Sequence, residues 1–344
     1  MSSVAVVSFR LGGTDGVSIE AAKWVAALER LGHDVRTVAG TGVADHLVAG
    51  LDAGATTLPS SVQLEQAIDG CDIVVVENVA SLPLNVAARD VLYGALGTRH
   101  ALFRHHDLPW QRDHLAHLPG PRDAPQWRHV TINDLSRRQL QNRGIEATTM
   151  YNTFDCSPVP GRRDATRRAL GVSDEPLVVM MVRAIERKNV AGALELCDCL
   201  HAVLWITGPA EDGYGPRLES LLASSPVSVR RLLPLGVTVA DAYAAADLVV
   251  MSSTWEGFGN PVLESVTHRR PLALNPYPVA LEITAFGFDF FDLRDIARIT
   301  AFLERPDQTM LDSNLAVARE HFNIASLPSR LDALLANFPA LGEE

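Results

Sequence analysis

Short, wholly apolar segments alternate with amphipathic ones along most of this chain. Val4–Phe9 (VAVVSF) fits a buried strand, Val17–Leu31 has apolar residues at helical spacing, and Val35–Val38 begins a second strand. Strands that are apolar on both faces are typical of a parallel sheet covered by helices on two sides. The first forty residues therefore predict a βαβ unit of an α/β fold.

A segment rich in proline, glycine and charge, CSPVPGRRDATRR from residue 156, separates two runs of this alternation. We interpret it as a linker between two domains, and a length of 344 residues fits two domains of common size. We predict one domain over residues 1–156 and another over 157–324, with a C-terminal helix at about 325–344 that can pack back on the first. Two such doubly wound sheets would bind ligands in a cleft at the carboxyl ends of their strands.

The remaining elements are predicted from the same pattern. In the first run, strands are expected at Ile73–Val76, Ala101–Arg104, Val130–Asn133 and Thr148–Tyr151, and helices near Asn85–Leu96 and Leu135–Arg143. In the second run, strands are expected at Leu177–Val182, Val203–Thr207, Val227–Leu232, Leu248–Met251 and Leu272–Leu274. Helices of the second run are expected near Val190–Leu200, Tyr214–Leu222, Val239–Ala245 and Pro261–His268, with a mostly helical tail from about Ile296.

Acidic residues outnumber basic ones, 41 Asp and Glu against 30 Lys and Arg, which gives a net charge of −11. This balance argues against a nucleic-acid-binding protein and disfavours association with a membrane surface. The first ten residues lack the pattern of a signal peptide, and no apolar run is long enough to span a membrane. The four cysteines form no CxxC pair, so we expect reduced thiols and a cytoplasmic protein.

The segment Glu256–Glu264 (EGFGNPVLE) follows a predicted strand and opens a predicted helix. Asn260 is predicted as the N-cap with Pro261 in the first turn, and backbone N–H groups at a helix start favour phosphate or sugar oxygens. Glu264 then lies one position beyond a capping-box glutamate, so capping does not explain it. A carboxylate that points into a cleft suits a pair of ribose hydroxyls. The alternative is an ordinary helix start whose glutamate is favoured by the dipole.

A second cluster, VRAIERKNV, follows another predicted strand and holds Arg183 and Lys188. Two cations at the end of a parallel strand can neutralise a diphosphate and the charge that it gains as a leaving group. Lys188 is one of only two lysines in the chain. The alternative is a solvated group of loop charges that includes Glu186 and Arg187.

Together, the two segments resemble the retaining glycosyltransferases of family 4. That family has a carboxylate pair in an E-x7-E frame, which Glu256 and Glu264 match, and an arginine followed five positions later by a lysine, which Arg183 and Lys188 match. Weaker similarities occur in the family's order: a Gly-Gly pair in the first loop, LGHDV after the first helix, YNTFD before the linker and TGPAEDG after a strand. The resemblance covers nearly the whole chain. It implies the GT-B fold, in which two Rossmann-like domains face each other across the active site, the first on the acceptor side and the second binding the nucleotide sugar.

The resemblance also implies roles for individual residues. Arg183 and Lys188 are expected to hold the donor diphosphate, and Glu264 the ribose hydroxyls of the nucleotide. Glu256 is expected to position the transferred sugar rather than to act as a nucleophile. Further donor contacts are expected from the backbone amides of Gly257, Phe258 and Gly259, from the helix start at Asn260, and from the first loop through Gly12 and Gly13.

The family also has a histidine beside the sugar, at the end of a strand in the first domain. RHHDLP offers two here, and we prefer His106, which an aspartate follows, over His105. A structural role is the alternative for a histidine of this pair. The first loop, GGTDGVS, is longer than the family's common form, so Asp15, Gly16 or Ser18 can take over part of its ligand contacts. Other departures from the family pattern are Asn152–Thr153, Ser252–Ser253 and Asn260.

Six of the eleven histidines lie between His100 and His129, among several arginines. We expect this segment to line the acceptor side, where arginine and histidine would recognise a carboxylate or phosphate. A loop of solvated charges is an equal alternative. A metal site that uses His114 and His117 is disfavoured, because the tight ligand spacing of a structural site is missing and the family's fold implies no metal.

We therefore predict an enzyme that moves a hexosyl group from a UDP- or GDP-sugar to the hydroxyl of a small acceptor, which can be anionic, with retention of configuration. The resemblance implies that the departing phosphate takes the acceptor proton and that neither a cofactor nor a metal is needed. The alternatives are a GT-B-fold sugar-nucleotide epimerase, which needs no acceptor, and a nucleotide-binding module without turnover. A nicotinamide dehydrogenase fits poorly, because no G-x-G-x-x-G follows the first strand.

Overall fold

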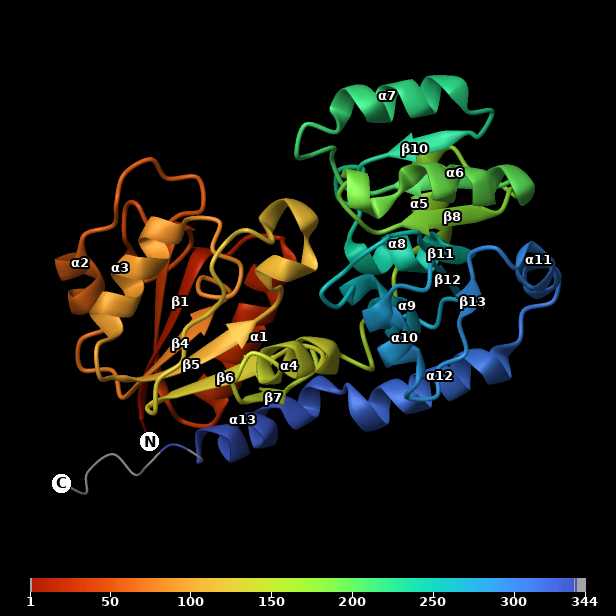
Figure 1. The fold of residues 1–344 in the computed structure, drawn as a ribbon. Helices are drawn as coiled ribbons and strands as arrows, with labels where there is room; N and C mark the ends of the chain where they lie inside the picture. Colours follow the sequence, from red (N-terminus) through yellow and green to blue (C-terminus); the bar gives the residue numbers. More distant parts are fainter. Residues whose placement is uncertain (1, 337, 339–344) are drawn as a thin grey trace. The chain divides into compact units, whose positions relative to one another are not determined.

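The computed structural model describes residues 2–336 and residue 338. By its internal contacts the chain divides into unit 1, Met1–Asn152 with Ala325–Glu344, and unit 2, Thr153–Ile324. Each unit is built on one sheet in which every observed strand pairing is parallel (Figure 1). The predicted α/β class with two parallel, doubly wound sheets is confirmed.

The sheet of unit 1 has seven strands in the order β3-β2-β1-β4-β5-β6-β7. This order reverses direction beside β1, the switch that places ligand sites at the carboxyl ends of the neighbouring strands. The strands are β1 Ser3–Leu11, β2 Asp34–Gly42, β3 His46–Leu47, β4 Ile73–Glu77, β5 His100–His105, β6 Trp127–Thr131 and β7 Ala147–Thr149. The helices are α1 Gly16–Arg30, α2 Ser61–Ala67, α3 Val86–Leu96, α4 Asp134–Gln141 and α13 Leu327–Leu335, with two short 3-10 turns at Pro109–Gln111 and Asp113–Leu115.

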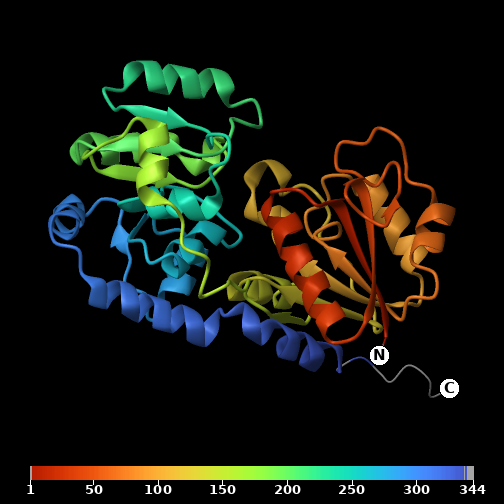
Figure 2. The same ribbon diagram turned by 180° about the vertical axis from the view of Figure 1, so that it is seen from behind.

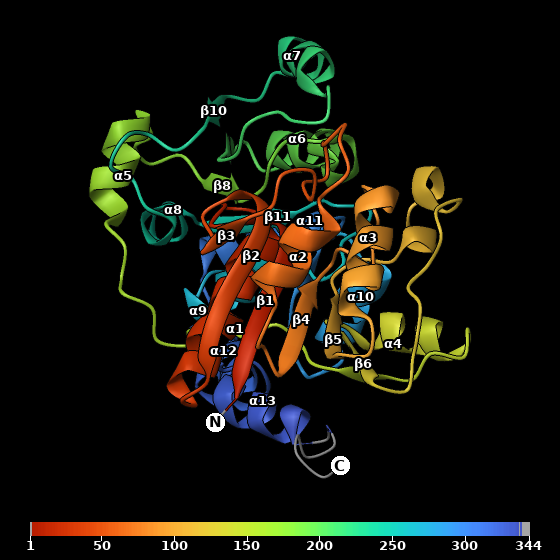
Figure 3. The same cartoon turned by 90° about the vertical axis from the view of Figure 1, so that its left-hand side faces the viewer.

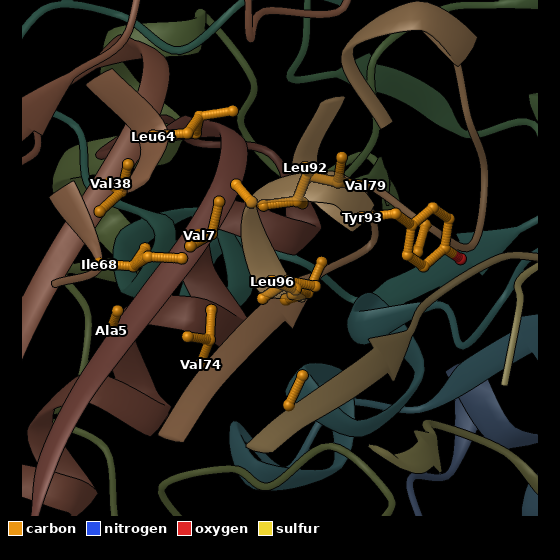
Figure 4. Close-up of a cluster of buried hydrophobic side chains, with 14 of the residues drawn as sticks. Ala5, Val7, Val38, Leu64, Ile68, Val74, Val79, Leu92, Tyr93 and Leu96 are labelled. Carbon is orange, nitrogen blue, oxygen red and sulfur yellow. The ribbon is translucent and has the colours of Figure 1, made fainter. Parts of the chain in front are cut away.

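Helices cover both faces of the unit 1 sheet, which explains why its central strands β1 and β4 are largely apolar and buried. On one face α2 and α3 pack over β1, β2 and β4 in a core that joins strand residues such as Val7 and Val38 to helix residues such as Leu64 and Leu92 (Figures 3 and 4). On the other face α1 lies beside α13 (Figure 2), and their apolar side chains close a second core with Val4 and Val6. Because α13 completes this core, the C-terminal part of the chain belongs to the first unit.

The sheet of unit 2 has six strands in the order β10-β9-β8-β11-β12-β13, the same pattern of reversal, here beside β8. The strands are β8 Leu177–Met180, β9 Val203–Ile206, β10 Val229–Arg231, β11 Leu248–Met251, β12 Leu272–Leu274 and β13 Phe291–Asp292. The helices are α5 Arg163–Leu170, α6 Val190–Cys199, α7 Gly215–Ser224, α8 Val239–Ala245, α9 Asn260–Thr267, α10 Pro278–Thr284, α11 Ile296–Glu304 and α12 Gln308–His321. Short 3-10 turns lie at Glu186–Lys188 and Ile324–Ser326.

The segment predicted as a linker is only partly one. Helix α5 occupies its second half, so the linker prediction is wrong there. Arg163 donates to the last carbonyls of α8, at Ala244, Ala245 and Ala246, and Arg167 donates to the Ala245 carbonyl at 3.1 Å. In the sequence these arginines resemble solvated charges of a linker. In the structure they donate hydrogen bonds to carbonyls at the C-terminal end of α8.

The first unit ends at Asn152, four residues before the boundary expected at 156. The reason is the contact of Phe154 with unit 2: its N–H donates to the Phe322 carbonyl at 2.7 Å, and its ring packs on Phe258 at 5.9 Å.

Most predicted strands and helices are confirmed within a few residues, whereas α2, α10, β3 and β13 were not predicted. Among the described residues, no helix combines the length and the apolar character that crossing a membrane requires.

Candidate active site

Two loops of unit 2 meet at the carboxyl ends of β8 and β11, which are parallel neighbours. Ser252 Oγ donates to the Lys188 carbonyl at 2.9 Å, and the Thr254 N–H donates to the Arg187 carbonyl at 2.9 Å. These bonds connect the loop after β8 to the loop after β11. The two segments that the sequence singles out are therefore brought together by the sheet.

The meeting point holds a buried cluster of three charges. Lys188 Nζ donates to one Glu256 carboxylate oxygen and Arg187 Nη1 donates to the other, while Arg187 Nη1 also reaches the Trp255 carbonyl at 2.9 Å. Burial alone would raise the pKa of Glu256, but Lys188 and Arg187 outweigh it and lower the pKa to about 2. The cluster therefore contains an ionised carboxylate between two cations and carries one net positive charge.

Arg183, predicted to act with Lys188, holds a different carboxylate. Its Nη1 donates to Glu211 Oε2 at 2.6 Å, and the two side chains are 41% and 40% exposed. Arg187, which the sequence suggested only as part of the alternative, a solvated group of loop charges, is instead the second cation on Glu256. In the sequence, Arg187 is marked only by its position before Lys188. Spacing alone does not show which of two adjacent charged side chains turns inward.

Helix α9 begins at Asn260, and Gly259 is its N-cap residue with φ of +87°. The prediction of Asn260 as the N-cap is therefore wrong by one position. Only glycine fits the cap, since a Cβ at Gly259 would lie 2.4 Å from Tyr277 Oη, and φ is in the left-handed region. Tyr277 Oη also donates to the Phe258 carbonyl at 3.1 Å, which fixes the turn that Gly257 opens. Glu264 lies outside a capping box counted from either cap.

The ring of Phe258 is buried in unit 2. It packs against Phe154 and lies edge-on to Phe322 with a centroid distance of 6.4 Å. The side chain therefore anchors the loop, and only the backbone of this residue is suited to the ligand contact that the resemblance implies.

Glu264 is held by a residue that the sequence analysis missed. Tyr243 Oη, on the buried face of α8, donates to Glu264 Oε2 at 2.7 Å, and the tyrosine ring stacks on His268 at 4.7 Å. Burial, and then the nearby carboxylate, raise the pKa of Tyr243 well above its ordinary value of 10, so the hydroxyl keeps its proton. A tyrosine within the small-residue stretch DAYAAAD was the available signal.

In unit 1 the loop after β1 contains Gly12 and Gly13. Gly12 has φ of +72°, and a Cβ there would lie 2.8 Å from Val43 Cβ, so the turn requires glycine. Asp15 caps α1 by accepting from the Ser18 N–H at 3.1 Å, and it also accepts from Ser18 Oγ and from Arg10. The sequence suggested that Asp15 and Ser18 can take over part of the loop's ligand contacts. In the structure their side chains are hydrogen-bonded to each other.

The structure separates the two candidate histidines by what their rings contact. Both ring nitrogens of His105 are hydrogen-bonded inside unit 1, Nδ1 with Ser81 Oγ at 2.6 Å and Nε2 with His129 Nδ1 at 2.9 Å. His106 Nε2 bonds to Glu77 Oε2 at 2.7 Å, and no described residue bonds to its Nδ1. Of the two, His106 is therefore the one whose ring has a nitrogen left for a ligand.

Glu77 belongs to a buried charge network that the sequence analysis missed. Arg104 donates to Glu77 at 3.2 Å and to Glu20 at 3.3 Å, and its guanidinium lies 4.3 Å from the Trp24 ring centroid. Burial would raise the pKa of Glu77, but Arg104 and His106 outweigh it, so the pKa falls below its ordinary value. The signal for this network was Glu77 itself, a carboxylate that ends an otherwise apolar strand, IVVVE.

The histidine- and arginine-rich segment divides into a buried part and an exposed part. Most of its strand residues are buried, whereas His114 and His117 are exposed. Arg112 pairs with Asp107 at 2.9 Å, next to His106 along the chain. Within residues 2–336 and 338, no group of three or more His, Cys, Asp or Glu side chains is placed to hold a metal ion.

A family model described as glycosyl transferases group 1 matches residues 162–291, which contain every candidate residue of unit 2. The chain is similar to mannosylglucosylglycerate synthase of Thermotoga maritima, with 24% identity over 380 residues and 85% of each chain covered. It is also similar to mannosylglucosylglycerate synthase of Petrotoga mobilis, with 23% identity over 424 residues, 99% of this chain and 97% of that one.

Solved structures show the same architecture. HepE of Anabaena in complex with UDP and glucose matches with a TM-score of 0.76 and 16% identity, covering 98% of this chain and 100% of that one. Sucrose-phosphate synthase of Thermosynechococcus elongatus matches with a TM-score of 0.74 and 15% identity, covering 98% of both chains. The predicted GT-B fold, with two Rossmann-like α/β domains, is thereby confirmed.

Proposed function

We propose that this protein is a group 1 glycosyltransferase that moves a hexosyl group from a nucleotide-diphosphate sugar to an acceptor hydroxyl with retention of configuration. The observation that carries this proposal is the cluster of Arg187, Lys188 and Glu256 at the ends of β8 and β11, in the loop that leads into α9. Two cations around one carboxylate leave a positive charge, and the positive end of the α9 dipole adds to it. An anionic diphosphate is the ligand that such a site suits.

In the proposed reaction the bond between sugar C1 and the diphosphate oxygen breaks, while the acceptor oxygen bonds to C1 on the same face. The acceptor proton passes to the departing phosphate, on which negative charge grows. Arg183, Lys188 and the start of α9 at Asn260 stabilise that charge, and a single contact of this kind contributes about 3 kcal/mol. Because the phosphate acts as the base, no protein carboxylate has to attack C1, and Glu256 is assigned to positioning the sugar and Lys188.

The remaining donor contacts follow from the turn before α9. Glu264, fixed by the Tyr243 hydroxyl, accepts hydrogen bonds from the ribose hydroxyls. The backbone amides of Gly257, Phe258 and Gly259 lie in a turn held by Tyr277 and are assigned to the sugar and phosphate oxygens. On the unit 1 side, His106 is assigned to the transferred sugar, and the Gly12–Gly13 turn to the phosphates.

The names of similar proteins support a substrate class. Structures of HepE are in complex with UDP, with UDP and glucose, or with UDP-glucose. The synthases that match this chain are named for a product that contains glycerate, which carries a carboxylate. We therefore propose a UDP- or GDP-sugar as donor and a small hydroxyl compound with an anionic group as acceptor. Arg112, beside Asp107 at 2.9 Å, is the cation we assign to that group.

The proposal is tested by measuring nucleotide release from UDP- and GDP-sugars with and without acceptors, for the wild type and for Lys188→Ala and Glu264→Ala. Each substitution should lower turnover by roughly a hundredfold or more while the protein stays folded. The matched controls are Arg231→Ala and Glu219→Ala, which remove the members of an exposed ion pair in unit 2 and should leave turnover unchanged.

Near wild-type turnover in both Lys188→Ala and Glu264→Ala would contradict the assignment. Conversion of the donor without an acceptor would indicate the epimerase alternative. Nucleotide-induced thermal stabilisation without any turnover would indicate a binding module, because a ligand that binds the folded state raises its stability by mass action.

A further inference from the structure

A chain of hydrogen-bonded side chains runs through unit 1 beside the candidate histidine. Ser81 Oγ lies 2.6 Å from His105 Nδ1, and His105 Nε2 lies 2.9 Å from His129 Nδ1. His129 Nε2 then lies 3.1 Å from Asp123 Oδ1. The first three side chains are buried, whereas the Asp123 side chain is 41% exposed. The chain thus joins a buried hydroxyl to a carboxylate that water reaches.

The sheet itself aligns the two rings. His105 ends β5 and His129 lies in the adjacent strand β6, where it pairs with Phe103 in register. The planes of the two imidazoles differ by only 10°. Because both strands are fixed by ladder hydrogen bonds on either side, the rings have no freedom to choose other partners without a shift of the sheet.

The chemistry of the groups gives the chain one direction. The ionised Asp123 carboxylate can only accept, so His129 must donate from Nε2. When His129 is neutral, its Nδ1 accepts, and His105 must therefore donate from Nε2 and accept at Nδ1. Ser81 then donates its hydroxyl proton to His105; the Arg104 carbonyl is a poorer acceptor for it at 3.4 Å.

The neutral state that this direction requires is favoured at both rings. Burial lowers the pKa of His105 well below its ordinary 6.5, and repulsion from His129 and His106 lowers it further. Burial also lowers the pKa of His129, against the opposing effect of Asp123. Both histidines are therefore uncharged near neutral pH.

The buried end of the chain lies on the loop that holds His106. The Ser81 N–H donates to the Asn78 carbonyl at 3.1 Å. Asn78 Oδ1 in turn accepts from the His106 N–H at 3.1 Å and from the Asp107 N–H at 3.3 Å. Asn78 has φ of +62°, a backbone state that its surroundings must maintain. The orientation of Ser81 and the place of His106 are thus set by one short loop.

We propose that Ser81, His105 and His129 are positioning residues for His106, and that Asp123 fixes the direction of their hydrogen bonds from the surface. This inference rests on the proposed function, in which His106 contacts the transferred sugar. None of the chain's members touches the substrate; they act through the loop of Asn78. The outer end opens into a hollow of about 510 Å³ that Asp123 lines with Arg128 and Glu146.

The direction of the chain is tested by nitrogen NMR of histidine-labelled protein at about pH 7.5. In the wild type, His105 and His129 should both show the neutral tautomer with hydrogen on Nε2. Asp123→Ala removes the accepting end, so the two tautomers should mix and the His106 signals should move. Asp123→Asn keeps an accepting oxygen and should restore the wild-type pattern.

The consequence for His106 is tested by steady-state kinetics of the same variants. Asp123→Ala should lower kcat by roughly tenfold, because misplacing a group by about 1 Å can cost up to a hundredfold. The donor KM should stay unchanged, since the proposed nucleotide contacts lie in unit 2. Glu146→Ala is the matched control, an exposed carboxylate that lines the same hollow outside the chain, and it should change neither kcat nor the tautomers.

Two outcomes would overturn the inference: an Nδ1–H tautomer at His105 or His129 in the wild type, or wild-type kcat and unmoved His106 signals in Asp123→Ala. A loss of thermal stability alone in this variant, with tautomers unchanged, would also overturn it. The NMR result does not depend on any sugar transfer. Absence of glycosyltransfer with every donor would therefore reject the proposed function while leaving the hydrogen-bond chain to be judged by its tautomers.

Discussion

The charged clusters at the two sheets differ in how they balance their charges. In unit 2, Arg187 and Lys188 surround the single carboxylate of Glu256, which leaves one positive charge. In unit 1, Arg104 lies between the carboxylates of Glu20 and Glu77, and Lys23 also pairs with Glu20, so the charges cancel.

This difference in net charge indicates different roles for the two clusters. A cluster with surplus positive charge at the end of parallel strands is suited to receive an anion. A cluster that is neutral and largely buried stabilises its own members, here the Glu77 carboxylate, which bonds to His106 at 2.7 Å. We therefore expect substitutions in unit 2 to alter donor binding, and substitutions in unit 1 to alter stability and the position of His106.

The largest effect should come from Arg104→Ala, because it leaves two buried carboxylates without their shared cation. Removing one partner of a buried pair costs about 3–5 kcal/mol of unfolding free energy, and here two pairs are lost. Hydrogen exchange should accelerate in β4 and β5 of unit 1 but not in β8 and β11 of unit 2. Arg138→Ala, which breaks an exposed pair with Asp134, is the control and should cost less than about 1 kcal/mol. Equal effects of the two substitutions would contradict the account of unit 1.

Glu256→Gln should have a smaller effect on stability and an opposite effect on charge. It removes the anion between Arg187 and Lys188, and we expect a loss of about 3 kcal/mol in unfolding free energy, measured by urea titration. Because the net positive charge rises, UDP should bind at least as tightly by calorimetry, whereas turnover should fall since the sugar is no longer positioned. Weaker UDP binding in a folded variant would show that Glu256 contacts the nucleotide in another way. Glu219→Gln, in an exposed pair, is the control for both measurements.

Tyr243→Phe removes only a hydroxyl from unit 2 and should leave the ring stacked on His268. A hydrogen bond to a charged group contributes about 1.5–3 kcal/mol, so Glu264 should lose its fixed orientation. We expect the dissociation constant for UDP to rise by roughly tenfold, and the unfolding free energy to fall by no more than this hydrogen bond contributes. An unchanged constant would mean that Glu264 is oriented by something other than Tyr243.

The sequence was informative where chemistry depends on spacing and not where it depends on packing. The parallel sheets, and the meeting of Lys188 with Glu256, follow from apolar strands that end in charged loops, because parallel strands bring such loops to one edge. Arg187 and Tyr243 were missed, since the inward turn of one charge among several, or of one ring in an alanine-rich helix, is decided by side chains far along the chain. Glu77 was missed because a carboxylate inside an apolar core is tolerated only with a cation that the sequence places 27 residues away.

The helix start at Asn260 shows the same limit on a smaller scale. Asparagine is a common N-cap, yet Gly259 takes that place because the Tyr277 hydroxyl, from a loop after β12, occupies the space of a side chain. Likewise the arginines of α5 belong to a helix rather than a linker because they meet the carbonyls of α8. At α9 the local sequence predicted the right element but not its first residue, whereas at α5 it did not predict the helix.

The smallest effect expected is a pH dependence of the stability of unit 1. Because burial lowers the pKa of His105 and His129 below 6.5, the unfolded chain binds protons at these positions before the folded one does. Their contribution to stability is therefore complete above pH 6.5 and is lost as the pH falls, by at most about 1.4 kcal/mol for each histidine between pH 6.5 and 5.5. Glu77 and Glu256 do not interfere, since their lowered pKa values confine the stability lost through them to below about pH 4.5.

Hydrogen exchange in β5 and β6, corrected for intrinsic rates, should reveal the loss of stability that the two histidines cause. Unit 2, where burial lowers the pKa of one half-buried histidine, His268, should lose less, and an equal or larger loss there would contradict the contrast drawn between the units.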